Sequence, residues 1–175
     1  MAALKDLPPK NASSDALLGA FLALLVGVVR MTPASAEVQG AALIRPAVAL
    51  VVLTAIVAVL MAVYRNVAVI RGAASRRYFQ TFTADPPAEW VERPTRTYMN
   101  LLELPMLFYV ACLFMLTTGK FDSIQVSLAW LFVVTRYAHA LIYIAFNHVP
   151  LRFTAFATGV LTLAMMWTRF AMQTL

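Results

Sequence analysis

Long runs of apolar residues alternate with short polar stretches through most of this chain. Four runs have about the length, roughly 20 residues, that crosses the hydrocarbon core of a bilayer, and they cover about residues 46–64, 96–118, 124–146 and 151–171. The short links at 119–123 and 147–150 make the helices that they join antiparallel. The pattern therefore predicts an all-α membrane protein, a four-helix transmembrane bundle with up-down topology.

A fifth, shorter apolar run precedes these spans. Residues 16–29 are uncharged and follow a start that contains Lys5 and Lys10, and Ala34-Ser35-Ala36 has the pattern of a signal-peptide cleavage site. Two interpretations stay open, an uncleaved additional N-terminal hydrophobic helix and a signal segment that is removed. We accordingly divide the chain into an N-terminal extension at 1–40 and a four-helix domain at 41–175.

Composition excludes most soluble classes of protein. The chain is 62% hydrophobic and 13% charged, whereas soluble domains are about 45–50% apolar and about 25% charged. The net charge of +6 does not indicate a nucleic-acid partner, because the basic residues flank apolar spans and do not cluster on one solvated face. The partner that the composition predicts is the lipid bilayer.

Basic residues are distributed unequally between the two ends of the predicted bundle. One end holds Arg45, Lys120 and Arg169, and the end with the long polar connection at 65–93 holds Arg65, Arg71, Arg76, Arg77, Arg93, Arg96 and Arg152. The positive-inside rule places this long first loop in the cytoplasm of a multi-pass protein of the cell inner membrane. We expect 85–87, Asp-Pro-Pro, to break any helix in the loop, and Pro94 to occupy the first turn of the second span.

Polar side chains recur at helical spacing inside two of the spans. They are Arg96, Asn100 and Glu103 in the second span, and Arg136, His139 and Tyr143 in the third. Spacings of i, i+4, i+7 and of i, i+3, i+7 each put three residues on one helix face. Since a charge at a helix centre costs roughly 2.5–3.5 kcal/mol on insertion scales, we expect both stripes to face the interior of the bundle.

Two interpretations account for these stripes. In the structural one, Glu103 pairs with Arg136 in a buried salt bridge, while Asn100 and His139 form hydrogen bonds between helices. In the functional one, the excess of arginine over glutamate indicates a site for an anionic ligand, because guanidinium groups match carboxylates and stay charged. No metal site is predicted, since His139 and His148 lack carboxylate or thiolate companions, and Cys112 is the only cysteine.

At these positions the sequence resembles a known family, the membrane-associated proteins in eicosanoid and glutathione metabolism. The resemblance covers about residues 41–175 and rests on Arg96-x3-Asn100-x2-Glu103-x-Pro105, on Arg136-x2-His139-x3-Tyr143, and on Arg152 nine residues further on. The runs at 100–109 and 147–153 are similar to those of bacterial members.

The resemblance implies a homotrimer that binds glutathione as co-substrate between neighbouring subunits. By correspondence, the glutathione-binding residues would be Arg96, Asn100, Glu103, Arg136 and His139. Arg152 and Tyr143 would be the catalytic residues. The implied activity is that of a glutathione-dependent transferase or peroxidase, which adds the glutathione thiolate to a lipophilic small molecule.

Two departures from the family pattern favour a different function: Phe153, and the N-terminal extension, which has no counterpart in the short bacterial members. Phe153 stands where the prostaglandin synthases of the family have a serine, so thiolate activation by such a hydroxyl is excluded. Leu104 also replaces an aromatic residue of some members. The alternative is a non-catalytic protein of the same fold, acting as a structural or accessory subunit of a larger membrane complex.

Overall fold

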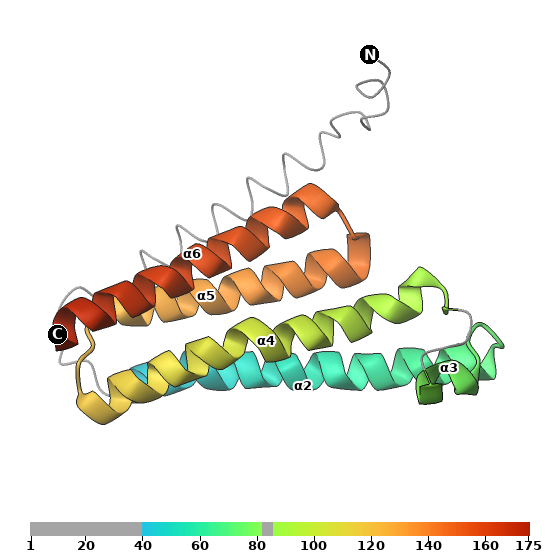
Figure 1. Ribbon diagram of the computed structural model, residues 1–175, viewed down its shortest axis with the longest axis horizontal. Helices are drawn as coiled ribbons and strands as arrows, with labels where there is room; N and C mark the ends of the chain where they lie inside the picture. The colour runs from blue at the N-terminus through green and yellow to red at the C-terminus, as the bar shows by residue number, and fades with distance from the viewer. Residues whose placement is uncertain (1–39, 82–85) are drawn as a thin grey trace, which may run out of the picture.

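The computed structural model describes residues 40–81 and 86–175, and most of these residues lie in helices (Figure 1). The elements are α2 (Ala41–Ile70), α3 (Arg76–Thr81), α4 (Glu89–Thr118), α5 (Ser123–Leu141), the π-helix η1 (Ile142–Phe146) and α6 (Val149–Thr174). Of these, α2, α4, the α5–η1 helix and α6 are long and apolar enough to cross a membrane. The predicted fold class is confirmed; the expected N-terminal helix or signal segment lies outside the described residues.

The four long helices form a bundle in which successive spans are antiparallel (Figure 1). α2 packs mainly against α4, α5 packs mainly against α6, and α2 also contacts α5. α3 and the link between η1 and α6 lie at one end of the bundle, and the link between α4 and α5 lies at the other with the C-terminus (Figure 1).

The helices extend beyond the predicted spans. α2 has 30 residues and is therefore about 45 Å long, more than the roughly 30 Å of the hydrocarbon core. α4 begins at Glu89, so Pro94 lies in its second turn and our first-turn prediction was wrong. The missing N–H of Pro94 removes only one of the earliest intrahelical hydrogen bonds, and Glu89 and Glu92 in the first turn favour a helix start by their charge.

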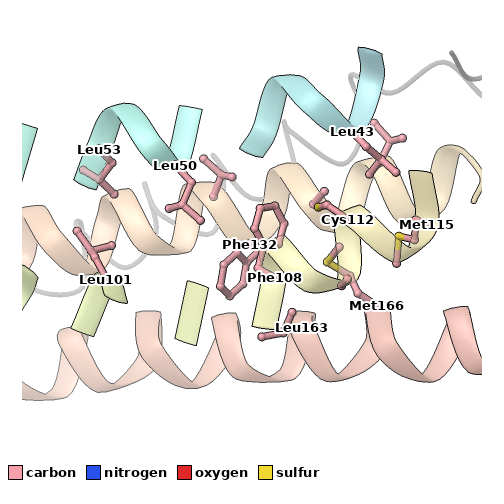
Figure 2. Close-up of a cluster of buried hydrophobic side chains, with 14 of the residues drawn as sticks. Leu43, Leu50, Leu53, Leu101, Phe108, Cys112, Met115, Phe132, Leu163 and Met166 are labelled. Atoms are coloured by element: carbon pink, nitrogen blue, oxygen red, sulfur yellow. The ribbon is translucent and has the colours of Figure 1, made fainter. Parts of the chain in front are cut away.

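Side chains from all four long helices form one apolar core (Figure 2). At its centre the rings of Phe108 and Phe132 stack with centroids 4.8 Å apart, which joins α4 to α5. The Tyr137 hydroxyl also donates a hydrogen bond of 2.8 Å to the Ala49 carbonyl on α2. The outward faces carry exposed apolar side chains such as Val59 and Leu161, as expected for contact with lipid.

Asp122 links α5 to α6 at the end of the bundle that carries the C-terminus. It is the N-cap of α5 and accepts a hydrogen bond of 3.1 Å from the Gln125 amide. Arg169 and Gln173 of α6 both donate to the same carboxylate. The bond from Arg169 holds the pKa of Asp122 below its usual value, so the carboxylate stays charged and ties α5 to α6.

Candidate functional site

A polar cavity of about 350 Å³ lies at the end of the bundle that carries α3. Its walls come from α3, the segment just before α4, the first turns of α4, η1 with the link that follows it, and the start of α6. The lining residues are Tyr78, Pro86, Pro87, Glu89, Glu92, Arg93, Arg96, Tyr143, Asn147, Val149 and Arg152. Three of the seven expected site residues, Arg96, Tyr143 and Arg152, therefore meet here.

Arg152 and Tyr143 form a stacked pair in the wall of the cavity. The guanidinium carbon of Arg152 lies 4.0 Å from the centroid of the Tyr143 ring, and its Nη1 donates a hydrogen bond of 2.8 Å to Asn147 Oδ1. Asn147 ends η1 in the left-handed conformation, with φ 48°, which asparagine tolerates better than most residues. The local chain geometry thus brings the two expected catalytic residues together.

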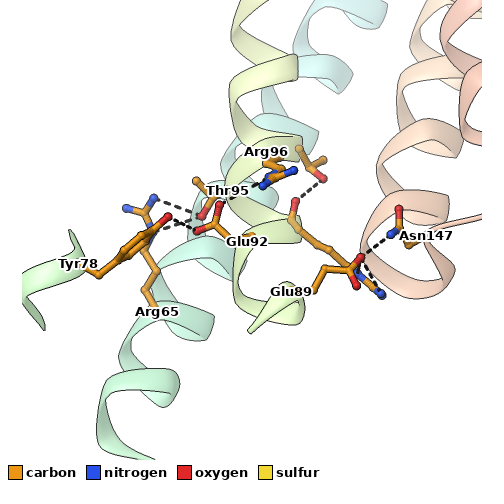
Figure 3. Close-up of polar contacts among 9 residues, drawn as sticks. Arg65, Tyr78, Glu89, Glu92, Thr95, Arg96 and Asn147 are labelled. Atoms are coloured by element: carbon orange, nitrogen blue, oxygen red, sulfur yellow. Dashed lines mark hydrogen bonds and ion pairs between the residues drawn. The ribbon is translucent and has the colours of Figure 1, made fainter. Parts of the chain in front are cut away.

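Two glutamates link the arginines of α4 to neighbouring elements (Figure 3). Glu89 pairs with Arg93 at 3.2 Å and accepts a hydrogen bond from the Asn147 amide. Glu92 lies 3.6 Å from Arg96 Nε. The Arg96 side chain is still 65% exposed, so it can turn toward a ligand.

α3 lies against this network (Figure 3). The Tyr78 hydroxyl donates a hydrogen bond of 3.2 Å to Glu92, and partial burial together with the Glu92 charge raises the pKa of Tyr78. Arg65 donates to the Thr95 hydroxyl at 3.2 Å and lies 5.2 Å from the Phe79 ring centroid. The end of α2 therefore holds both α3 and α4 at the cavity.

Asn100 and Glu103 share a face of α4 with Arg96, as expected, but they do not line the cavity. Glu103 is the 15th of the 30 residues of α4 and is exposed. Asn100 is half-buried, and its Oδ1 has no hydrogen-bond partner among the described residues. The expectation that this stripe faces the interior of the bundle was therefore wrong, because Arg96 and Glu103 are exposed and only Asn100 is partly covered by the subunit itself.

Arg136 turns away from the cavity and into the contact between α5 and α6. It is 0% exposed, its Nη2 donates to the carbonyl oxygens of Ala155 and Phe156 at 3.3 and 3.2 Å, and the structure does not form the expected pair with Glu103. His139 is also buried, with its ring centroid 6.1 Å from that of Phe156 and 6.2 Å from that of Tyr143. The stripe on the third span therefore divides, with Tyr143 alone reaching the cavity.

Sequence reasoning missed Glu89, Glu92 and Arg93 as lining residues. They have a signal, because together with Arg96 they stand at i, i+3, i+4 and i+7 and so share one helix face. The signal was hidden because we started the second span at residue 96. Across the described ranges, no group of three or more His, Cys, Asp and Glu side chains could hold a metal ion.

Four membrane-spanning helices with a polar cavity at one end, lined by arginine and glutamate side chains, define a polytopic membrane protein with a candidate ligand site. The MAPEG family model matches residues 43–172, and the chain belongs to this family of membrane proteins of glutathione-related transferase and peroxidase type. No curated protein and no solved structure matches the chain significantly.

Proposed function

We propose that this chain is a glutathione-dependent transferase or peroxidase of the membrane, which adds the glutathione thiolate to lipophilic electrophiles. The observation that carries the proposal is the stack of Arg152 on Tyr143 in the wall of a cavity that two further arginines line. A cation held at a fixed place beside a hydroxyl is suited to stabilise a thiolate.

The charges around the cavity complement those of glutathione, which carries two carboxylates and one ammonium group. Arg93 and Arg96 offer donors for carboxylates, and Glu89 and Glu92 offer acceptors for the ammonium group. When glutathione binds, these side chains would exchange the ion pairs among themselves for ion pairs with the ligand. The cavity therefore suits a zwitterionic peptide better than a simple anion.

The proposed chemistry starts from a thiol whose pKa is about 8.5 in water. The Arg152 cation and the Tyr143 hydroxyl would stabilise the thiolate, and the thiol proton would pass to solvent. The sulfur then forms a bond to the electrophilic carbon, and the leaving group departs with its electron pair. The lipophilic co-substrate would reach the sulfur from the bilayer.

The exposed position of Glu103 supports the homotrimer that the family resemblance implies. Glu103 is exposed near the middle of α4, and Asn100 beside it has an unsatisfied buried oxygen. A second subunit packed on this face would cover Glu103 and would place it at a glutathione shared between subunits. His139 would support Tyr143 from behind, since their ring centroids are 6.2 Å apart.

We also propose that the cavity opens to the cytoplasm and that the protein lies in the cell inner membrane. Arg71, Arg76 and Arg77 are exposed on the same end of the bundle as the cavity, in line with the positive-inside rule. The cytoplasm is also where glutathione is kept reduced.

The test is calorimetric titration of the detergent-purified protein with glutathione, followed by assay with a generic aryl halide. We expect saturable binding, about tenfold weaker in Arg96→Ala, and conjugation about a hundredfold slower in Arg152→Ala. Arg76→Ala is the matched control, since it removes an exposed arginine from the same end outside the cavity. Absence of saturable binding in the parent protein would refute the proposal, as would equal effects in the control.

A second candidate function is that of a non-catalytic structural or accessory subunit of a larger membrane complex. It is favoured by the internal partners that Arg93, Arg96 and Arg152 already have, and by Phe153, which is 67% exposed and offers no hydroxyl. Under this alternative Arg96→Ala lowers the unfolding temperature, glutathione does not raise it, and a stoichiometric partner protein copurifies from gently solubilised membranes.

A further inference from the structure

Arg136 is a buried cation without a counter-charge in the part of the chain that the structure describes. It is 0% exposed in the middle of a membrane-spanning helix. Two of its nitrogens, Nε and Nη1, have no hydrogen-bond partner among the described residues. Burying a charge in this way is costly, so the position needs an explanation beyond packing.

Its side chain occupies a slot that only glycine leaves open. A Cβ atom on Gly159 of α6 would overlap Arg136 Nη2 and would lie 2.9 Å from its guanidinium carbon. Because that Cβ is absent, Nη2 reaches the backbone oxygens of Ala155 and Phe156. The rings of Phe132 and Phe156 lie on the guanidinium, each with its centroid 5.3 Å from the guanidinium carbon.

The turn of α6 that Arg136 holds is the turn that carries Arg152. Ala155 and Phe156 follow Arg152 by three and four residues, so they lie on the same side of the helix. Arg152 in turn stacks on Tyr143, seven residues after Arg136 in the chain. These contacts connect α5 to α6 and then connect α6 to η1, which directly follows α5.

We propose that Arg136 is a positioning residue, which fixes the register of α6 against α5 through the slot at Gly159 and so holds Arg152 over Tyr143. This role replaces that of glutathione ligand, which the resemblance implied. The structural half of the proposal stands by itself, and the catalytic half rests on the proposed function.

The structural half is tested with Gly159→Ala, Arg136→Met and the double variant. Both single variants should speed hydrogen exchange in the first two turns of α6, because each removes the guanidinium from its carbonyl partners. Gly159→Ala should also lower the unfolding temperature, since it leaves the displaced charge buried, whereas Arg136→Met removes that charge and should change the unfolding temperature little. The double variant should lose clearly less stability than Gly159→Ala alone, because the methyl group introduced on α6 then has no guanidinium to displace. Thr135 Oγ1, 2.8 Å from the same Cβ position, limits the rescue to a partial one.

The catalytic half is tested by the pH dependence of the ultraviolet absorbance of bound glutathione thiolate. Displacing Arg152 should move the apparent pKa of the bound thiol upward by about one unit, the low end of the effect of one neighbouring cation. Met166→Ala is the control, since it shortens a buried side chain of α6 that lies outside the slot at Gly159. It should lower the stability of the protein without changing the pH dependence of the thiolate absorbance. Arg136→Lys keeps the positive charge but lacks the planar guanidinium group with its several donors. It should therefore raise the apparent pKa of the bound thiol as Arg136→Met does.

The outcomes separate this proposal from the proposed function. A double variant that loses as much stability as Gly159→Ala alone, or unchanged exchange in the first two turns of α6, overturns the positioning role whether or not glutathione binds. If glutathione does not bind the parent protein, the proposed function fails and the first experiment still decides the structural half. If glutathione binds and the apparent pKa of the bound thiol is unchanged in both Gly159→Ala and Arg136→Met, the catalytic half of the proposal is wrong.

Discussion

Asp122 shows how a single carboxylate stabilises this bundle. It caps α5 and accepts hydrogen bonds from Arg169 and Gln173 on α6, with its side chain 34% exposed. The bond from Arg169 lowers its pKa from the ordinary value of 3.8. Because the pKa is lower in the folded state, the charged form stabilises the fold above the unfolded-state value, and this stabilisation is lost as the pH falls through the folded value.

We therefore expect the unfolding temperature in detergent to fall when the pH is lowered from about 6 to about 3, with part of the fall due to Asp122. Asp122→Ala should cost about 1 kcal/mol at neutral pH through the lost cap. Asp122→Asn keeps a capping oxygen but cannot titrate, so the difference in unfolding temperature between it and the parent protein should close at low pH. A difference that is constant with pH would contradict this account.

The site residues were predictable from the sequence only in part. Arg96, Tyr143 and Arg152, three of the seven expected site residues, line one cavity within a single subunit. The spacing from Arg136 to Tyr143 puts both residues near one helix face, but the Arg136 side chain turns into the contact with α6 at Gly159, while Tyr143 lines the cavity. No hydropathy pattern reveals which way a side chain on that face turns.

Among the elements, α3 was not expected at all. It has only six residues, too few for a helical period to show in a sequence, and its place depends on contacts with Arg65 and Glu92 that lie far from it in the chain. The four long spans were expected because their apolar length alone indicates them. Only their ends differ, because polar helix turns continue beyond the hydrocarbon.

We expect Tyr78→Phe to loosen α3, because it removes the hydrogen bond to Glu92. Loss of this hydrogen bond to a carboxylate should give roughly severalfold more of the locally open form. The measurement is the initial rate of tryptic cleavage at Arg76 and Arg77 in the detergent-solubilised protein. Tyr98→Phe, a change in the groove between α2 and α4, is the control and should leave the rate unchanged.

At the scale of the whole molecule, Glu103 is the feature that the single subunit does not explain. It is exposed near the middle of a membrane-spanning helix, where a charged side chain facing lipid costs roughly 2.5–3.5 kcal/mol. Cover by another subunit removes that cost.

The proposed trimer therefore predicts a particle of three subunits in native mass spectrometry from a mild detergent. Glu103→Ala should shift the distribution toward smaller species, because it removes the partner of a polar contact across the interface. Lys120→Ala, which removes an exposed charge in the link between α4 and α5, should leave the distribution of oligomeric states unchanged. A parent protein that is monomeric in several detergents would show that the α4 face is not a subunit interface.

The π-helix at the end of α5 has a consequence for sequence comparison. A π turn contains one residue more than the α turn that it replaces, so in alignments it behaves as a one-residue insertion. Deleting a single residue between Ile142 and Phe146 would restore a regular helix and rotate the C-terminal part of the chain by about 100° relative to α5. Such a deletion would leave Arg136 and Arg152 in the sequence and still move Arg136 away from the turn of α6 that carries Arg152.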